Sequence, residues 1–385
     1  MGDQKLCGAL GLVLTKLKPY LAMVSLQFGY AGMFIITMVS LKRGMSHWVL
    51  VVYRHAVATL AMAPFALLLE RKIRPKMTIS IFLKIMLLGL LEPVFDQNLY
   101  YVGMQYTSAT FASATINVLP AITFIMAVIF RLERVKMKQI HSVAKVVGTV
   151  IIVTGAMLMN LYKGPIVDIL FSGGGGGGNH HKHSSSSSAQ HWTTGTIMLL
   201  SCVFGWSGFF ILQSITLKEY PAELSLAALI CLLGMVEGGA VALVMERDMS
   251  AWVVGFDSRL LAAVYSGIVC SGIAYYLQSM VNKARGPLFV SAFSPLCMII
   301  TAILGALVLS EQVHLGSLIG AIIIVIGLYS VVWGKSKDQP SSMNSITSEN
   351  GQSNELPVVN TTKSSVKVGG DGIDGPVKSC LPQEP

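Results

Sequence analysis

The feature that most constrains this chain is a series of long apolar segments that recur along almost its whole length. Three of them, at 102–130, 192–217 and 286–310, contain no Lys, Arg, Asp or Glu. About 20 apolar residues in a helix cross the hydrocarbon core of a bilayer. A helix also satisfies its own backbone hydrogen bonds there. The pattern therefore predicts an all-α integral membrane protein.

Ten such segments can be placed. Apolar residues make up 53% of the chain and charged residues only 12%, a balance that a water-soluble domain of this size could not bury. The first segment runs without charge from 20 to 40, which is too long for the core of a cleavable signal peptide, so we expect it to remain as a helix. The predicted transmembrane helices are 20–40, 47–69, 80–101, 107–130, 141–161, 193–216, 222–245, 260–281, 287–310 and 313–333.

The basic residues indicate orientation. A net charge of +9 could suggest nucleic-acid binding, but Lys and Arg form short clusters between the apolar segments rather than one basic face. We therefore expect the lipid bilayer, and no nucleic acid, as a partner. If the amino terminus is cytoplasmic, 16 Lys and Arg residues flank the segments inside and 6 outside. This asymmetry places both termini in the cytoplasm.

Two stretches of different composition divide the chain. Residues 173–188 read GGGGGGNHHKHSSSSS, which is too polar and flexible to pack, and the chain beyond 335 is rich in Ser, Gly, Pro, Asn and Thr. The predicted parts are a cytoplasmic amino terminus (1–18), a first five-helix half (19–162), a low-complexity extracytoplasmic linker (163–191), a second five-helix half (192–334) and a disordered cytoplasmic tail (335–385).

Several chemical motifs are missing. The glycine run is not followed by Gly-Lys-Ser or Gly-Lys-Thr, so ATP-driven pumping is not predicted. His180, His181 and His183 lie in the flexible stretch without fixed geometry, so no metal site is predicted. There is no HExxH motif and no nucleophile beside the acids of the apolar segments, so we expect no enzyme and no cofactor.

The two halves are copies of each other. FGYAGMF at 28–34 aligns with FGWSGFF at 204–210, and the same offset of 176 pairs Glu70 with Glu246. Chance does not keep one offset over separate sites. Further matched pairs, at offsets of 175 or 172, are Tyr100 and Tyr275, Pro120 and Pro295, Gly148 and Gly320, and Gly155 and Gly327.

This duplication predicts an inverted repeat. Each half has five crossings, an odd number, so the second copy must enter the membrane from the opposite side. Inverted halves can exchange shapes between two conformations of similar energy, which opens a central site first to one side and then to the other. The repeat therefore favours a transporter over a receptor or a structural protein.

Several longer motifs carry a family resemblance: LQFGYAG at 26–32, VYRH at 52–55, EPVFDQNLYYVGMQYTSATFASATINVLPAITFIMAVIFRLE at 92–133, AKVVGT at 144–149, LYKGP at 161–165 and GSLIGAIIIVIGLYSVVWGK at 316–335. With these motifs the chain resembles plant drug/metabolite transporters with two EamA repeats, in the nodulin-like, WAT1-related branch called UMAMIT (Usually Multiple Acids Move In and out Transporters). The resemblance covers nearly everything from 18 to 335.

The resemblance implies ten helices, cytosolic termini, a substrate cavity lined by helices one to four and six to nine, and amino acids as the usual cargo. We expect a secondary or facilitative carrier of small organic metabolites in the plasma membrane. One alternative is a vacuolar carrier of auxin or another metabolite. A membrane receptor or sensor is the alternative of another class, although the chain has no recognition domain for it. The oligomeric state is left open.

A few ionisable residues lie inside the predicted helices. Each costs about 2.5–3.5 kcal/mol on insertion scales, so those that remain are functional candidates. Arg54 lies in the second helix, and Glu92 and Asp96 lie in the third, on one face with Tyr100 because these three are spaced by four residues. A neighbouring stripe of the third helix contains Gln97 and Tyr101.

Two interpretations of these charges are open. In the functional one, Glu92 and Asp96 bind the ammonium or polar part of a zwitterionic cargo, and Arg54 pairs with the cargo carboxylate or with one of the acids. In the structural one, Arg54 and one acid form a buried ion pair that only fixes packing. Proton coupling through a carboxylate is a further hypothesis.

Other polar and aromatic residues are weaker candidates for the cavity, because packing or interhelical hydrogen bonding would also explain each of them. Glu237 is expected near the outer boundary, exposed to water. Pro120 and Pro295 are expected to free a backbone carbonyl in mid-helix, and the matched glycines to allow close helix packing. The remaining cavity candidates are Gln27, Tyr30, Asn98, Asn117, Trp206, Gln213, Tyr275 and Gln278, among which Tyr30 and Trp206 are repeat equivalents.

Overall fold

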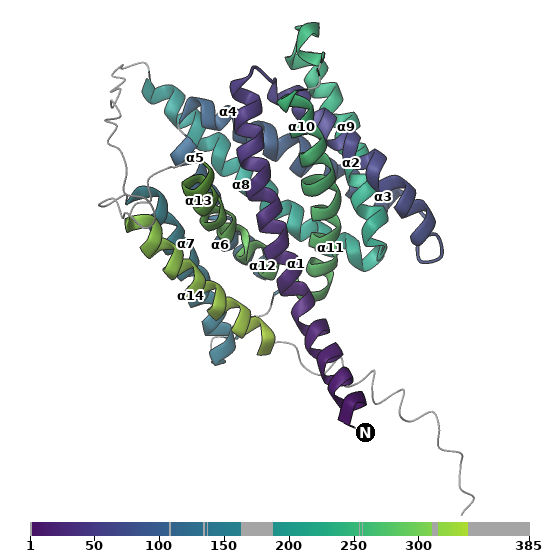
Figure 1. The fold of residues 1–385 in the computed structure, drawn as a ribbon, viewed down its shortest axis with the longest axis vertical. Helices are drawn as coiled ribbons and strands as arrows, with labels where there is room; N and C mark the ends of the chain where they lie inside the picture. Colours follow the sequence, from purple (N-terminus) through teal and green to yellow (C-terminus); the bar gives the residue numbers. More distant parts are fainter. Residues whose placement is uncertain are drawn as a thin grey trace, which may run out of the picture. The chain divides into compact units, whose positions relative to one another are not determined.

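The chain is helical throughout almost all of the part that the structure describes (Figure 1). In this computed structural model the described residues are 2–107, 109–133, 135–136, 138–162, 188–253, 255, 257–309 and 315–337. Within these ranges, nine helical spans are long and apolar enough to cross a membrane. A further crossing, from Ile79 to Tyr106, is a continuous run of helical elements that carries charged residues. The fold is therefore the predicted all-α membrane fold with ten crossings.

Some crossings are single helices and others are divided. The single helices are α1 (Gly2–Lys42), α2 (His47–Leu69), α7 (Ile140–Leu161), α8 (Ser188–Glu219), α9 (Glu223–Met245) and α14 (Leu315–Lys337). The divided crossings are α3 (Ile79–Gly89) with η1 (Leu90–Asp96) and α4 (Gln97–Tyr106); α5 (Ala109–Ile116) with α6 (Leu119–Ile129); α10 (Ser258–Tyr265) with η3 (Ser266–Ile273) and α11 (Ala274–Arg285); and α12 (Pro287–Ala292) with α13 (Ser294–Leu309). A short 3₁₀ turn, η2 (Met249–Trp252), precedes α10.

Differences from the predicted helices lie mainly at their ends. α2 has the predicted bounds, whereas α1 begins at Gly2 rather than near residue 20, and α8 begins at Ser188, inside the predicted linker. The rest of that linker, with its glycine run and three histidines, lies outside the described residues. So does the predicted tail beyond the end of α14.

The third and eighth crossings are interrupted at matching places. Their central segments, η1 and η3, are π-helical, and η3 begins 176 residues after η1. A π-helical turn is wider than an α-helical turn and is often found at functional sites. Pro93 lies inside η1, where it has no N–H group to donate. The duplication is therefore preserved in the irregular backbone as well as in the sequence.

The fourth and ninth crossings also break at equivalent points. A turn at Asn117 and Val118 separates α5 from α6, and a turn at Phe293 separates α12 from α13. Pro120 and Pro295 are each the second residue of the helix that follows. They begin a half-helix, where a missing N–H costs no hydrogen bond, rather than lying in mid-helix as predicted.

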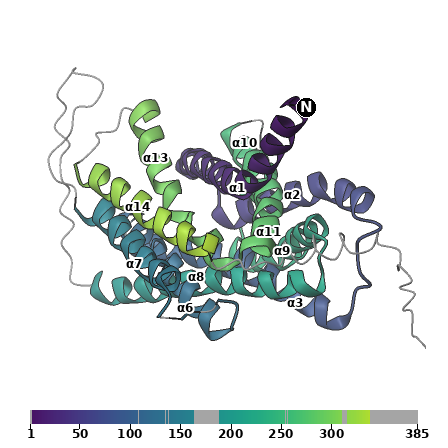
Figure 2. The same cartoon turned by 90° about the horizontal axis from the view of Figure 1, so that it is seen from below.

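Equivalent helices of the two halves pack against each other in opposite directions. The Glu70 side chain at the end of α2 accepts a 2.9 Å hydrogen bond from the N–H of Leu224 at the start of α9. α7 and α14 lie side by side (Figures 1 and 2), with Gly148 against Gly327 and Gly155 against Gly320. Residue numbers rise in one helix as they fall in its partner. The halves therefore form the predicted inverted repeat.

The glycines between α7 and α14 allow the closest of these approaches. A Cβ atom on Gly148 would lie 2.9 Å from the carbonyl oxygen of Gly327, and one on Gly320 would lie 2.7 Å from that of Gly155. Small residues of this kind let membrane helices touch through their backbones. The matched glycines thus serve helix packing, as expected.

The repeated Phe-Gly motif has a similar reciprocal role. A Cβ atom on Gly29 of α1 would lie 2.9 Å from Val269 in η3 of the second half. A Cβ atom on Gly205 of α8 would lie 3.0 Å from Phe95 in η1 of the first half. Each motif therefore packs against the π-helical segment of the opposite half.

A buried charge cluster joins the ends of three elements. Glu133, just after α6, pairs through Oε1 with Lys145 Nζ of α7 at 2.7 Å and through Oε2 with Lys335 of α14. The side chains of Glu133 and Lys145 are 2% and 0% exposed. Two cations thus share one buried carboxylate.

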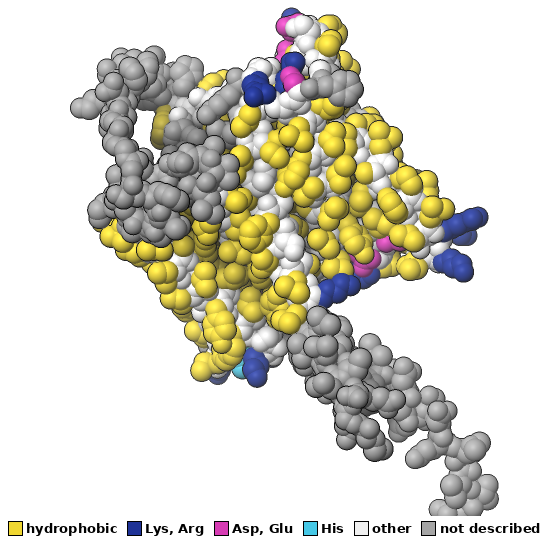
Figure 3. All heavy atoms as spheres, viewed as in Figure 1, with side chains coloured by type: hydrophobic (Ala, Val, Ile, Leu, Met, Phe, Trp, Pro, Cys, Tyr) yellow, Lys and Arg dark blue, Asp and Glu magenta, His cyan; other side chains and the backbone are white. Residues whose placement is uncertain are grey.

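Hydrophobic side chains cover the flanks of the helices (Figure 3). Leu68, Ile79 and Ile197 are 79%, 80% and 59% exposed. On the visible face, Lys, Arg, Asp and Glu gather near the ends of the helices (Figure 3). This is the surface that a hydrocarbon solvent requires, so the chain is a multi-pass integral membrane protein.

Candidate functional site

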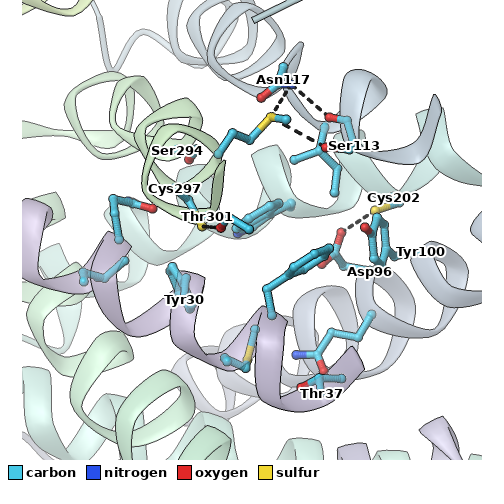
Figure 4. A pocket seen from close by; sticks show the side chains of 18 of the residues that line it. Tyr30, Thr37, Asp96, Tyr100, Ser113, Asn117, Cys202, Ser294, Cys297 and Thr301 are labelled. Carbon is cyan, nitrogen blue, oxygen red and sulfur yellow. Dashed lines mark hydrogen bonds between the residues drawn. The ribbon is translucent and has the colours of Figure 1, made fainter. Parts of the chain in front are cut away.

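A cavity of about 430 Å³ lies between the two halves. Its walls come mainly from α1, α2, the third crossing, α5, α8, α11, α12 and α13 (Figure 4). The fifth and tenth crossings add one residue each, Met159 and Ser317. The lining helices match those that the family resemblance implies, except that no lining residue comes from the seventh crossing, α9.

The cavity is displaced toward one end of the crossings. It reaches Leu41 near the end of α1, Met104 near the end of α4 and Ser317 near the start of α14. Toward the opposite end its lining residues include Met23, Phe210, Gln278 and Val290. The cavity therefore extends to the side of the membrane that carries the 43–46 turn.

A chain of hydrogen bonds runs along the polar wall of the cavity. Arg54 Nε donates to Ser271 Oγ at 2.5 Å, and Arg54 Nη1 donates to Gln97 Oε1 at 3.2 Å. Gln97 Nε2 in turn donates to Glu92 Oε1 at 3.1 Å. Glu92 Oε2 is buried and finds no hydrogen-bond partner among the residues that the structure describes. An amide thus separates the cation from the acid, and one carboxylate oxygen remains available to a ligand.

Asp96 is the second acid of the cavity. Its Oδ1 accepts a 2.8 Å hydrogen bond from the thiol of Cys202, which projects from α8 on the opposite half (Figure 4). Asp96 makes no ion pair within 4.0 Å among the described residues, and neither does Arg54. The buried Arg54–acid pair of the structural interpretation is therefore absent from the part of the chain that the structure describes.

The remainder of the cavity is largely apolar. Tyr30 and Trp206, the repeat equivalents, both line it, together with Met33 of α1 and Met298 of α13. Asn117 Nδ2 donates to the Met298 sulfur at 2.7 Å (Figure 4). Methionine adapts its shape to irregular contacts and aromatic rings offer amphipathic surface. The site thus joins a charged wall to an adaptable apolar one.

An amide cluster lies beneath the cavity. Gln213 of α8 accepts hydrogen bonds from Asn282 Nδ2 at 3.0 Å and from Gln278 Nε2 at 3.4 Å, and its own Nε2 donates to Ser279 Oγ at 3.0 Å. All four residues are buried. Among them only Gln278 reaches the cavity, so the cluster joins α8 to α11 below its floor.

Aromatic contacts lie further along the same side. Tyr20 and Phe289 meet edge to face with ring centroids 5.4 Å apart. The Arg285 guanidinium lies 5.6 Å from the Tyr20 ring and 5.9 Å from the Phe289 ring. These contacts join α1 to α11 and α12. Together with the amide cluster, they close the side opposite to the 43–46 turn.

Most of the predicted site residues meet in this cavity. Asn98 is not among its lining residues, and its side chain instead donates to the Val94 carbonyl. Gln213 belongs to the amide cluster, and Tyr275 packs against Phe209. The predicted residues that line the cavity are Gln27, Tyr30, Arg54, Glu92, Asp96, Gln97, Tyr101, Asn117, Trp206 and Gln278.

Several lining residues were not predicted. Small polar side chains inside apolar segments carry little signal, because Ser, Thr and Cys are common in helix packing. The unpredicted polar lining residues are Ser317 and the six labelled in Figure 4, Thr37, Ser113, Cys202, Ser294, Cys297 and Thr301.

Glu237 agrees with its prediction only in part. It lies on α9, two turns before Met245, and is partly exposed, but its Oε2 atom is buried and has no hydrogen-bond partner in the part of the chain that the structure describes. A Cβ atom on Gly89 would lie 3.2 Å from this oxygen. The packing of α3 against α9 covers this oxygen, and that contact could not be seen in the sequence.

The fold and the site together define a class: a multi-pass membrane protein with inverted halves around a central polar cavity, the architecture of a carrier. The EamA-like transporter family matches residues 17–161 and 193–333, once in each half. The chain belongs to this family and is a membrane transporter.

Similar proteins occur in Arabidopsis thaliana. The chain is 68% identical over 334 residues to WAT1-related protein At1g21890, covering 85% of this chain and 86% of that one. It is 59% identical over 348 residues to WAT1-related protein At1g44800, covering 90% and 93%. These relatives make the chain a plant-type, WAT1-related member of the family. One solved crystal structure matches with a TM-score of 0.62 at 15% identity, over 82% of this chain and 98% of that one. This similarity shows the fold alone.

Proposed function

We propose that this transporter is a secondary or facilitative carrier of small zwitterionic metabolites, amino acids foremost, that works by alternating access. The observation that carries the proposal is the buried Glu92 Oε2 atom, which lies in a cavity shared by the two halves and has no hydrogen-bond partner within the described part of the chain. A buried carboxylate oxygen without a partner is costly. A cargo ammonium would supply the missing hydrogen bond.

Arg54 supplies the complementary charge. A guanidinium has five N–H donors, and the hydrogen bonds to Ser271 and Gln97 leave others for a cargo carboxylate. Glu92 and Arg54 are linked through one amide, so one zwitterion could contact both ends of the chain. The apolar wall around Trp206 and Met298 would hold the side chain of the cargo.

The inverted repeat supports the transport mechanism. Exchange of shape between the halves would close the 43–46 side and open the opposite one around the same residues. The inside excess of Lys and Arg supports cytoplasmic termini. The two family matches support the predicted five-helix halves 19–162 and 192–334. We assign the plasma membrane as its location. Protonation of Glu92 or Asp96 during the cycle would couple transport to a pH gradient.

Radiotracer flux in reconstituted vesicles tests the proposal. A panel of amino acids, an indole carboxylic acid of the auxin class and their decarboxylated amines is measured with and without an imposed pH gradient. Faster entry of the amino acids than of compounds that lack either charge would support a zwitterion site. Preferred transport of the indole acid would favour the auxin alternative. Tight binding without flux would point to a receptor, and chemical conversion of the tracer to an enzyme.

A further inference from the structure

The helices α2 and α9 are strict repeat equivalents. α2 spans His47–Leu69 and α9 spans Glu223–Met245, so both ends differ by 176 residues. Glu70 follows α2 and Glu246 follows α9 at the same offset. Because the two helices are antiparallel neighbours, each glutamate lies on the membrane side where the other helix begins.

On one side this relationship forms a complete contact. Glu70 Oε1 accepts from the N–H of Leu224 at 2.9 Å, and Oε2 accepts from the N–H of Ser225 at 2.6 Å. Glu70 is 8% exposed. A carboxylate on the free N–H groups of a helix start combines charge-assisted hydrogen bonds with attraction to the helix dipole. Arg74 reinforces the contact by donating to Ser225 Oγ at 3.2 Å.

On the other side the equivalent contact is missing. The counterparts of Leu224 and Ser225 are Trp48 and Val49 in the first turn of α2. The N-cap residue Ser46 makes no side-chain capping bond, and the first turn of α2 contains no acid. Among the described residues, Glu246 makes no ion pair within 4.0 Å, although its carboxylate lies close enough to His47, the first residue of α2, to act on it electrostatically. Glu70 therefore binds the start of its partner helix through hydrogen bonds, whereas Glu246 lies near the start of its partner helix without the equivalent bonds.

The asymmetry matches the position of the cavity. The engaged Glu70 lies on the side closed by the amide cluster and by Tyr20 and Phe289, whereas Glu246 lies on the side that the cavity reaches. An inverted repeat changes state when its halves exchange their contacts. The contact now made by Glu70 must then have a counterpart in the alternate state.

We propose that Glu70 and Glu246 are reciprocal gating residues of the transport cycle. Glu70 holds the start of α9 while the cavity faces the 43–46 side. When the cavity faces the opposite side, Glu70 releases α9 and the Glu246 carboxylate binds the N–H groups of Trp48 and Val49. This inference rests on the proposed alternating access and adds the residues that set the balance between its two states.

Thiol labelling of Cys297, which lines the cavity midway along the ninth crossing, measures that balance. A membrane-impermeant methanethiosulfonate is added to one face of the reconstituted full-length protein at a time, and modified Cys297 is quantified by peptide mass spectrometry. The readout is the labelling rate from the Arg71 face divided by that from the Gly44 face. No cargo is needed, so the outcome is independent of whether the proposed substrate class is correct.

The two substitutions should act in opposite directions. Glu70→Gln should raise the ratio by about tenfold, equal to about 1.4 kcal/mol in the equilibrium. Glu246→Gln should lower the ratio by about tenfold and slow transport, because the state that the Glu246 carboxylate stabilises becomes rarer. The double variant should return close to the wild-type ratio. Asp248→Asn removes a nearby exposed carboxylate that accepts a hydrogen bond from the N–H of Ser250 in its own turn, and should leave the ratio unchanged.

Glu246→Gln is the decisive variant, because among the described residues it breaks no ion pair and removes only a longer-range attraction to His47, so folding should be kept. An unchanged or increased labelling ratio in this variant would overturn the proposal. If the Glu70→Gln protein fails to fold, the Glu246→Gln result still decides whether the proposal holds.

Discussion

Arg54 Nε lies 2.5 Å from Ser271 Oγ and donates a hydrogen bond to it. Arg54 belongs to α2 in the first half, and Ser271 belongs to η3 in the second half, 175 residues after Asp96. The first half thus carries the charges of the site, and the second half provides a neutral hydroxyl at the position equivalent to an acid. This division of roles leads to the first prediction.

Arg54→Lys should lower uptake by at least about tenfold at matched surface abundance. An ammonium is a compact point charge and cannot donate to Ser271, Gln97 and a cargo carboxylate with the fixed geometry of a guanidinium. Uptake per surface-biotinylated protein is the measurement. Arg259→Lys, in an exposed pair with Asp257, is the control and should transport normally. Full uptake by Arg54→Lys would show that only the positive charge matters.

Glu92→Gln should reduce uptake of zwitterions strongly without unfolding the protein. The amide oxygen can still accept the hydrogen bond from Gln97, so only the negative charge at the unpartnered oxygen is lost. Asp96→Asn similarly keeps an oxygen for the Cys202 thiol. Both variants are assayed for uptake at equal surface abundance. If both transport like the wild type, these acids do not bind the cargo.

Gly148→Ala should destabilise the packing of α7 against α14. Its Cβ atom would lie 2.9 Å from a backbone carbonyl oxygen, which cannot move aside as a flexible side chain could. Overpacking of this kind typically costs about 1–3 kcal/mol. Thermal unfolding in detergent, followed by fluorescence, measures the effect. A Cβ atom on Gly239 of α9 would meet nothing within 4 Å, so Gly239→Ala is the matched control and should keep or slightly raise the midpoint.

Glu133→Gln should be among the most destabilising single substitutions outside the cavity. It leaves Lys145 and Lys335 beside a neutral amide, and removing one partner of a buried ion pair typically costs about 3–5 kcal/mol. The exposed pair of Glu223 and Lys283 provides the comparison. Glu223→Gln should lower the free energy of unfolding by less than about 1 kcal/mol. Equal thermal shifts in the two variants would contradict the buried role of Glu133.

The arrangement of the crossings could be predicted because the bilayer imposes it. Long uncharged segments have few alternatives in hydrocarbon, and constant offsets between distant motifs reveal duplication without any structural information. The breaks within crossings could not be placed in the same way. A π-helical segment such as η3 contains no proline, so its position depends on packing against α1 and α2 rather than on local sequence.

The site was only partly predictable for a related reason. Arg54, Glu92 and Asp96 were found because ionised groups are costly in a membrane and hence conspicuous. Gln213 resembles the other amide candidates in sequence, yet it lies in the cluster below the cavity. The sequence gives the side-chain chemistry of each helix, but which half of the membrane holds the cavity depends on the conformation of the whole repeat.

The antiparallel pairings of α2 with α9 and of α7 with α14 have a consequence for the origin of this architecture. Every contact of this kind joins a segment to its own duplicate, so a lone five-helix unit would lack partners for the same surfaces. Such a unit could recreate them only by meeting a second molecule inserted upside down. A shorter precursor with no fixed orientation in the membrane would therefore assemble into antiparallel pairs. Fusion of two copies would then have fixed their opposite orientations.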